Sequence, residues 1–137
     1  MMVIMKGAVV MFIDISDIKK SYGAGESRVE VLKGISFGVE KGEFCVLLGP
    51  SGSGKSTLLN IIGGIDDADS GCISINGEKI ENMKEKALTD YRRRHLGYIF
   101  QMYNLIPNLN IKENVETGAY LSDHPLDVDD ILKTLGL

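Results

Sequence analysis

The sequence has few of the residues that build disulfides or metal sites. Its 137 residues include only two cysteines, Cys45 and Cys72, and two histidines. Each cysteine stands alone in an apolar stretch of strand-like composition, without a second cysteine or a histidine at metal-ligand spacing. We therefore expect both to be buried, reduced thiols, which is the usual state of cysteine in the cytoplasm.

An excess of positive charge is also missing. The formal net charge is -4 at pH 7, and the one dense basic cluster, Arg92, Arg93 and Arg94, is short. General attraction to a polyanion needs a basic patch or stripe, so we exclude nucleic acid as a partner. The charge pattern around these arginines predicts instead the solvent-exposed face of a helix.

A long, uninterrupted apolar run is missing as well. The start, MMVIMKGAVVMFI, is interrupted by Lys6 and Gly7, and no basic segment precedes its apolar part. It is too short to span a bilayer and does not have the organisation of a signal peptide. Because a strand-like pattern begins at Met11, we interpret residues 1–10 as an N-terminal extension or a start codon set too early, and residues 11–137 as the folded domain.

Hydrophobic periodicity predicts the elements of the first half of the chain. Alternating apolar and polar residues indicate strands at 11–22 and 29–39, separated by a turn at 23–27. Residues 44–48, FCVLL, form a continuous apolar run, which is typical of a strand covered on both faces in a parallel sheet. Residues 55–64 have helical spacing and end in two glycines.

The second half is predicted to be mostly helical. A short strand at 72–75 ends in the turn dipeptide Asn76-Gly77, and a charged helix follows at 84–95. Residues 98–100 have β character, and an irregular segment continues to Pro107. Two helices are expected at 111–121 and 127–135, the second with acidic residues at its start and Gly136 at its end.

The loop GPSGSGKST, residues 49–57, carries the chemistry. Gly49, Gly54, Lys55 and Ser56 match the phosphate-binding pattern GxxxxGK[ST], placed between an apolar strand pattern and a helix. Its glycines let the backbone N–H groups surround a phosphate, and the helix start adds a positive dipole end. Lys55 is predicted to bridge the β- and γ-phosphates, and Ser56 to bind a magnesium ion. The residues expected to contact the nucleotide are Gly49, Pro50, Ser51, Gly52, Ser53, Gly54, Lys55, Ser56 and Thr57.

This loop alone leaves kinases, GTPases and transport ATPases open, and the surrounding sequence narrows the choice. The run KKSYGAGESRVEVLKGISFGVEKGEFCVLLGPSGSGKSTLLNIIGGIDDADSGCISINGEKI and the later YIFQMYNLIPNLNIKENV resemble the ATP-binding subunits of ABC transporters. The similarity is greatest to the bacterial branch that serves lipoprotein-release, macrolide-export and cell-division permeases, and it covers nearly all of residues 11–137. The resemblance implies an α/β fold, a P-loop NTPase of the ABC type with an N-terminal antiparallel β subdomain.

The resemblance also implies roles for Tyr22 and Gln101. Tyr22 in KSYG matches the aromatic residue that stacks on adenine, although a strand tyrosine is by itself also a common half-buried residue. Gln101 matches the Q-loop glutamine, which reaches the magnesium ion and the attacking water and contacts the membrane subunit. Outside this context a loop glutamine is usually solvated surface. The implied cofactors are ATP and Mg²⁺, and the implied partners are an integral membrane permease subunit and a second ATP-binding subunit, in a homodimer, at the inner face of the cell membrane.

Several motifs of the family do not occur in these 137 residues. No apolar run ends in Asp-Glu, and the LSGGQ-type signature, the D-loop and the switch histidine are absent. We therefore expect Mg-ATP binding without efficient hydrolysis, as in the incomplete N-terminal part of an ABC ATPase, and a marginally stable chain with open apolar surface. The alternative is a non-catalytic nucleotide-binding module that regulates a permease or a full-length partner. No motif in the sequence supports a third class, a small P-loop kinase or GTPase.

Overall fold

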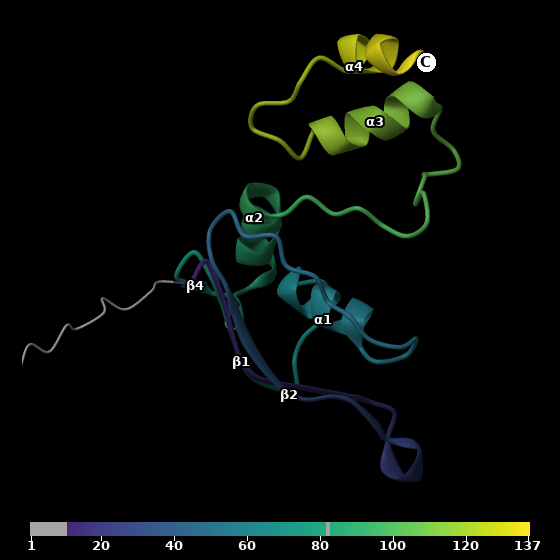
Figure 1. Cartoon of the computed structure of the whole chain (residues 1–137). Helices are drawn as coiled ribbons and strands as arrows, with labels where there is room; N and C mark the ends of the chain where they lie inside the picture. Colours follow the sequence, from purple (N-terminus) through teal and green to yellow (C-terminus); the bar gives the residue numbers. More distant parts are fainter. Residues whose placement is uncertain (1–10, 82) are drawn as a thin grey trace, which may run out of the picture. The chain divides into compact units, whose positions relative to one another are not determined.

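The computed structural model describes residues 11–81 and 83–137. The chain divides into two compact units, Met1–Leu88 and Thr89–Leu137. Figure 1 shows its helices and strands, coloured along the sequence from purple near the N-terminus to yellow at the C-terminus. The extension expected at residues 1–10 lies outside the described residues.

A four-stranded antiparallel sheet forms the frame of the first unit. Its strands are β1 (Ile13–Tyr22), β2 (Val29–Val39), β3 (Ser70–Ile75) and β4 (Glu78–Lys79), in the order β2-β1-β3-β4. A short 3-10 helix, η1 (Gly25–Ser27), lies in the β1–β2 connection. The expected antiparallel β subdomain is confirmed, and so is the turn between β3 and β4, where Asn76 and Gly77 have φ angles of 50° and 82°.

A β-bulge in β1 decides which side chains face the core. The pairing register with β2 shifts between Ile15 and Ile18, and Asp17 has a φ of 50°. Ile15 and Ile18 are therefore both buried although they are three residues apart. Beyond the bulge, Lys20 and Tyr22 reach the same loop contacts from one face of the strand. The buried side chains of this unit include Ile15, Ile18, Lys20, Leu32, Val39, Leu58, Ile61, Ile73, Ile75 and Ile80.

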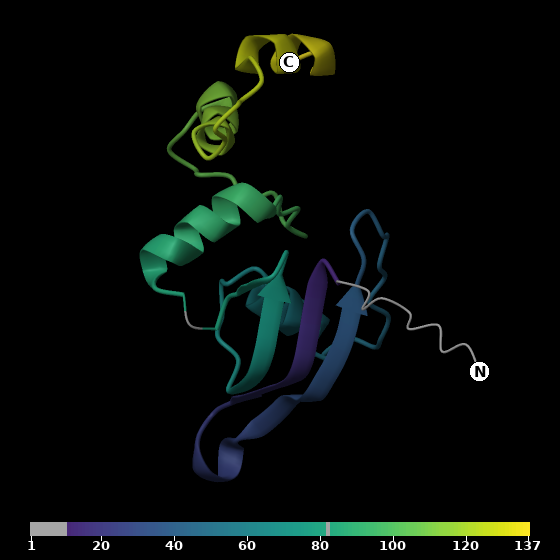
Figure 2. The ribbon, with the colours of Figure 1, turned by 90° about the vertical axis from the view of Figure 1, so that its left-hand side faces the viewer.

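Helix α1 (Lys55–Ile62) covers one face of the sheet, behind the strands in Figure 2. Its apolar period buries Leu58 and Ile61. The helix begins after Gly54 and ends at Gly63, as the glycines in the sequence predict. The loop at residues 49–57 thus leads directly into a helix that is packed on the sheet.

The segment at 44–48 does not form the expected buried strand. It is irregular, and Phe44 and Leu48 are 89% and 88% exposed. A strand is stabilised by hydrogen bonds to a neighbour, and the described sheet provides no neighbour for this segment. The β character expected at 98–100 is wrong for the same reason, because these residues are also irregular and exposed.

The burial expected for the two cysteines is also wrong. Both are free thiols, but both are exposed. Cys45 lies in the uncovered segment at 44–48. Cys72 alternates along β3 with Ile73, which is buried, so its side chain lies on the opposite, open face of the sheet.

Three further helices lie in the part of the chain that the structure describes: α2 (Glu85–His95), α3 (Ile111–Ala119) and α4 (Val128–Leu135). All three were expected from the sequence. A capping box starts α3, because the Asn110 side chain accepts from the Glu113 N–H at 2.9 Å and the Glu113 carboxylate accepts from the Asn110 N–H at 2.7 Å. The Asp127 carboxylate caps α4 at the N–H of Asp130, at 2.9 Å.

The basic cluster lies in the last turn of α2, where the helix dipole favours positive charge. Arg93 and Arg94 are exposed and Arg92 is half-buried, in agreement with the exposed helix face expected for them. Across the residues that the structure describes, no helix has both the length and the apolar character needed to cross a membrane.

Candidate nucleotide-binding site

The loop at residues 49–57 presents an open helix N-terminus. Gly52 and Gly54 have φ angles of 78° and 85°, which turn the backbone into the start of α1. Gly54 is the N-cap of α1, so no side chain caps the helix, and no acidic residue lies in its first turn. The first N–H groups of a helix have no partner within the helix and carry its positive dipole end. This arrangement favours a bound anion.

Packing against β2 fixes the place of the loop in the first unit. A Cβ atom on Gly54 would lie 2.8 Å from Leu32 Cδ2 and 3.0 Å from Val31 Cγ1. Both distances are shorter than ordinary van der Waals contact. The end of the loop therefore lies directly on the β1–β2 hairpin, and only glycine leaves room for this approach.

Lys55 folds back over the loop. Its ammonium group donates to the carbonyl oxygens of Gly49 and Pro50 at 2.8 and 2.7 Å and to Ser53 Oγ at 3.3 Å. All three acceptors are uncharged, so a phosphate that replaces them would form stronger, charge-assisted hydrogen bonds. Ser56 follows in the first turn of α1 and is exposed.

Tyr22 lies beside the end of this loop. It is 44% exposed, and its hydroxyl donates to Asp66 Oδ2 at 2.5 Å. The hydrogen bond with Asp66 raises the pKa of the Tyr22 phenol, partial burial raises it further, and the nearby Thr57 side chain acts in the opposite direction. The structure thus brings together Tyr22 and Thr57, two of the residues predicted to contact the nucleotide.

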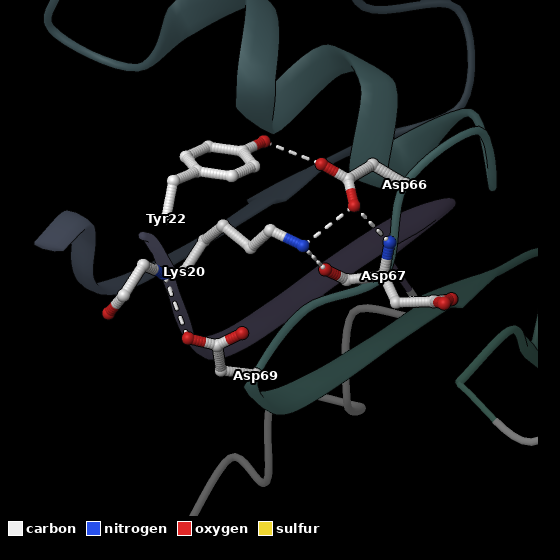
Figure 3. A network of polar contacts seen from close by, with 6 residues as sticks. Lys20, Tyr22, Asp66, Asp67 and Asp69 are labelled. Atoms are coloured by element: carbon white, nitrogen blue, oxygen red, sulfur yellow. Dashed lines mark hydrogen bonds and ion pairs between the residues drawn. The ribbon is translucent and has the colours of Figure 1, made fainter. Parts of the chain in front are cut away.

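An ion pair that sequence reasoning missed lies under Tyr22 (Figure 3). Lys20 is only 9% exposed, and its ammonium group donates to Asp66 Oδ1 at 2.6 Å and to the Asp67 carbonyl at 2.5 Å. Burial alone would lower the pKa of Lys20, but the hydrogen bond and charge of Asp66 outweigh it and raise that pKa. Burial likewise opposes the ionised form of Asp66, and the hydrogen bonds from Lys20 and Tyr22 hold its pKa below the ordinary value.

Two features of the sequence are consistent with this pair without predicting it. Lys20 precedes Tyr22 by two residues on a predicted strand, and side chains two residues apart on a strand share a face. The acidic run Asp66, Asp67 and Asp69 directly follows the helix that the phosphate-binding loop begins. Neither signal states that the two segments meet.

The cavity next to this pair is too small for a nucleotide. Its volume is about 30 Å³, and Ile18, Ile61, Asp66 and Asp67 are among its lining residues. That space is of the size of one water molecule. Within residues 11–81 and 83–137, no three His, Cys, Asp or Glu side chains are grouped to hold a metal ion.

Gln101 belongs to the second unit, Thr89–Leu137, whereas the phosphate-binding loop belongs to the first. It is exposed in the irregular segment between α2 and α3. Asn114 of α3 holds the end of this segment, accepting from the Ile106 N–H at 2.7 Å and donating to the Leu109 carbonyl at 3.0 Å. The role expected for Gln101 beside the phosphates stays a prediction.

Comparison with known sequences finds relatives that span far more than this chain. The macrolide export ATP-binding/permease protein MacB of Shigella flexneri is 43% identical over 130 residues, which cover 91% of this chain and 20% of that protein. The bacitracin export ATP-binding protein BceA of Halalkalibacterium halodurans is 50% identical over 103 residues, covering 75% of this chain and 41% of that protein. The chain thus spans less than half the length of either relative.

A solved structure and a family model agree with these relatives. The dimeric ATP-binding cassette MJ0796, bound to ADP and Pi, matches with a TM-score of 0.77 and 36% identity over 86% of this chain and 51% of that one. This match confirms the expected ABC-type P-loop fold. The family model described as ABC transporter matches residues 32–137. The chain therefore belongs to the ABC transporter family and lies within its ATP-binding domain.

Proposed function

We propose that this chain binds Mg-ATP as the nucleotide-binding part of an ABC ATPase that powers a membrane permease. The uncapped N-terminus of α1, with Lys55 at the mouth of the loop, is the observation that carries the proposal. Its free N–H groups are suited to the β- and γ-phosphates, and no acidic side chain in the first turn opposes them. The nucleotide bound by MJ0796, ADP with Pi, supports the same class of ligand.

Lys55 exchanges partners when the nucleotide binds. In the structure its ammonium group is held by the carbonyl oxygens of Gly49 and Pro50. In the complex the same group bridges the β- and γ-phosphates, where each hydrogen bond gains from the phosphate charge. The backbone of residues 49–57 then surrounds the phosphates through its N–H groups.

The other predicted contacts complete the nucleotide site in this proposal. The Ser56 hydroxyl takes one position on a magnesium ion that the phosphates bring, and Tyr22 stacks on the adenine ring from the end of β1. Gln101 supplies an amide oxygen to the magnesium ion and the attacking water. Hydrolysis further needs a carboxylate base and a partner surface over the γ-phosphate, which the whole ATPase would supply.

The proposed partners are an integral membrane permease subunit and a second ATP-binding subunit, with the chain on the cytoplasmic, inner face of the membrane. MacB is named as an ATP-binding and permease protein, and MJ0796 forms dimers, which supports both kinds of partner. The net charge of -4 supports a chain without a nucleic-acid partner. These two relatives, MacB and BceA, are named for different exported compounds, so we propose no substrate.

Isothermal titration of the 137-residue chain with Mg-ATP tests the proposal. Lys55→Met should weaken binding about 10- to 100-fold, since hydrogen bonds to charged groups contribute roughly 1.5–3 kcal/mol. Lys41→Met is the matched control, because Lys41 is exposed in the turn after β2 and outside the loop. Equal affinities of the unmodified chain and Lys55→Met would refute the phosphate role of Lys55. No Mg-ATP binding by the unmodified chain would refute the proposed function.

A further inference from the structure

One carboxylate, that of Asp66, connects Lys20 and Tyr22 of β1 to the loop after α1. Asp66 accepts from the Lys20 ammonium group through Oδ1, at 2.6 Å, and from the Tyr22 hydroxyl through Oδ2, at 2.5 Å. Figure 3 shows both side chains reaching Asp66 from the same strand. Asp66 also accepts from the N–H of Asp67 at 2.8 Å. Both oxygens of the carboxylate are thus engaged, and its orientation is fixed.

The Lys20 ammonium group also lies against the Tyr22 ring. Its nitrogen is 5.1 Å from the ring centroid, within the range of a cation–π contact. The Lys20 side chain is 11% exposed, so the cation does not move freely in solvent. Tyr22 keeps 44% of its surface exposed. The Lys20 cation therefore lies against one side of the ring, and part of the ring surface remains open for a ligand.

The loop that carries Asp66 is itself fixed to β1. Asp69 Oδ2 accepts from the Ser21 N–H at 2.8 Å, and the Asp69 N–H donates to the Lys19 carbonyl at 2.8 Å. The contacts of Asp66 with Lys20 and Tyr22 add to these two. Residues 19–22 of the strand are each bound to the loop at 66–69, so the loop is a rigid support for Tyr22.

We propose that Lys20 and Asp66 are positioning residues that hold the Tyr22 ring in the orientation in which it stacks on the base of the nucleotide. The inference rests on the proposed function and adds to it. A tyrosine that is free to rotate must lose that freedom when a base binds, whereas a ring fixed by its hydroxyl and by a cation beneath it has already lost it. Neither residue touches the phosphates, so both act on the base-dependent part of the affinity.

Comparing Mg-ATP with Mg-tripolyphosphate separates the base from the phosphates. The ratio of the two affinities reports what the base contributes, and partial unfolding of a variant cancels in it. Asp66→Asn and Lys20→Met should lower this ratio about 3- to 10-fold, a substantial part of one stacked base, and leave tripolyphosphate binding unchanged. Tyr22→Phe keeps the ring and the ion pair and removes only the hydroxyl contact, so it should lower the ratio in the same direction by less.

A second background shows whether the two residues act through Tyr22. When Tyr22 is already Leu, Asp66→Asn should not lower the ratio further. The matched control is Lys112→Met, which removes an exposed Lys112–Asp129 pair with the same 2.6 Å separation in the second unit and should change neither affinity.

Four results would overturn the inference, and they separate it from the proposed function. If Asp66→Asn weakens ATP and tripolyphosphate equally, the pair supports only the loop. If it changes neither, Tyr22 does not need the pair. If the unmodified chain binds both ligands equally, the base makes no contact with Tyr22, although the phosphate role of Lys55 stands. If it binds neither ligand, the proposed function fails and the inference fails with it.

Discussion

Substituting Gly54 tests whether the phosphate-binding loop is held by its contact with β2. Gly54→Ala places a methyl group 2.8 Å from Leu32 Cδ2 and 3.0 Å from Val31 Cγ1, at a φ of 85°. Gly52→Ala is the matched control, because its φ is 78° and a Cβ atom there would meet nothing within 4 Å. The two substitutions share the backbone strain, and only the first adds the steric conflict.

The two effects have known orders of magnitude. A left-handed backbone costs a non-glycine residue roughly 1–2 kcal/mol, and this cost lowers the free energy of unfolding of both variants. Overpacking costs about 1–3 kcal/mol more, and it affects only Gly54→Ala. We expect the free energy of unfolding to fall by about 1–2 kcal/mol for Gly52→Ala and by about 2–5 kcal/mol for Gly54→Ala. The second loss is large for a domain whose total stability is of order 5–15 kcal/mol.

Urea denaturation without nucleotide, followed by circular dichroism, measures both values. An unchanged dependence of the unfolding free energy on urea shows that stability, and not the unfolded state, has changed. Equal losses in the two variants would refute the reasoning, because they would show that the contact of Gly54 with Leu32 and Val31 has no energetic consequence. A smaller loss for Gly54→Ala than for Gly52→Ala would refute it as well.

Three further predictions concern stability. The first is that Lys20→Met costs the same unfolding free energy from about pH 5 to about pH 9 and less outside this range. Asp66 has a pKa held below 3.8, so its contribution is lost as the pH falls through that lowered value, and Lys20 has a pKa raised above 10.5, so its contribution is lost as the pH rises through that raised value. A cost that changes between about pH 5 and about pH 9 contradicts this prediction. Asn110→Ala should cost about 1 kcal/mol by removing the cap of α3, and no loss in urea denaturation would refute that role. Leu48→Ala should change the unfolding free energy by less than about 0.5 kcal/mol, while Leu58→Ala should cost about 2–5 kcal/mol because Leu58 is only 5% exposed. A large loss for Leu48→Ala would show instead that residues 44–48 are buried, as the sequence predicts.

Signals that are local in the sequence predicted much of the fold. The β1–β2 hairpin, the start of α1 at the glycine loop and the Asn76-Gly77 turn all follow from alternation and turn chemistry over a few residues. The acidic N-terminal end of α4 and its final Gly136 do so as well. Each of these features depends on neighbours in the chain, so the sequence alone is sufficient to place it.

Features that depend on a distant partner were not predicted correctly. The apolar run at 44–48 indicates a need for burial but does not say which strand would cover it, and in the described sheet none does. The burial expected for Cys45 failed with it. The ion pair of Lys20 with Asp66 joins residues 46 positions apart, and it requires that the loop after α1 lies on β1. Sequence patterns around either residue contain no information about that contact.

The bulge at Asp17 shows how a feature of the fold determines the site. In an unbroken strand, side chains two residues apart share a face, so the face of Ile15 would continue to Asp17 and Lys19. The extra residue at the bulge moves Ile18 onto the buried face, and Lys20 and Tyr22 follow it toward the loop after α1.

The strands on either side of β1 have glycines next to the bulge. A Cβ atom on Gly34 of β2 would lie 2.6 Å from Asp17 Oδ1, and one on Gly71 of β3 would lie 2.5 Å from the Asp17 carbonyl oxygen. Two glycines in different strands thus leave the space that the bulge needs, and Ser36 Oγ accepts from the Asp17 N–H at 2.8 Å. In an unbroken strand Lys20 and Tyr22 would lie on the face opposite to Ile15. The place of the proposed base contact therefore depends on the bulge, for which Gly34 and Gly71 leave room.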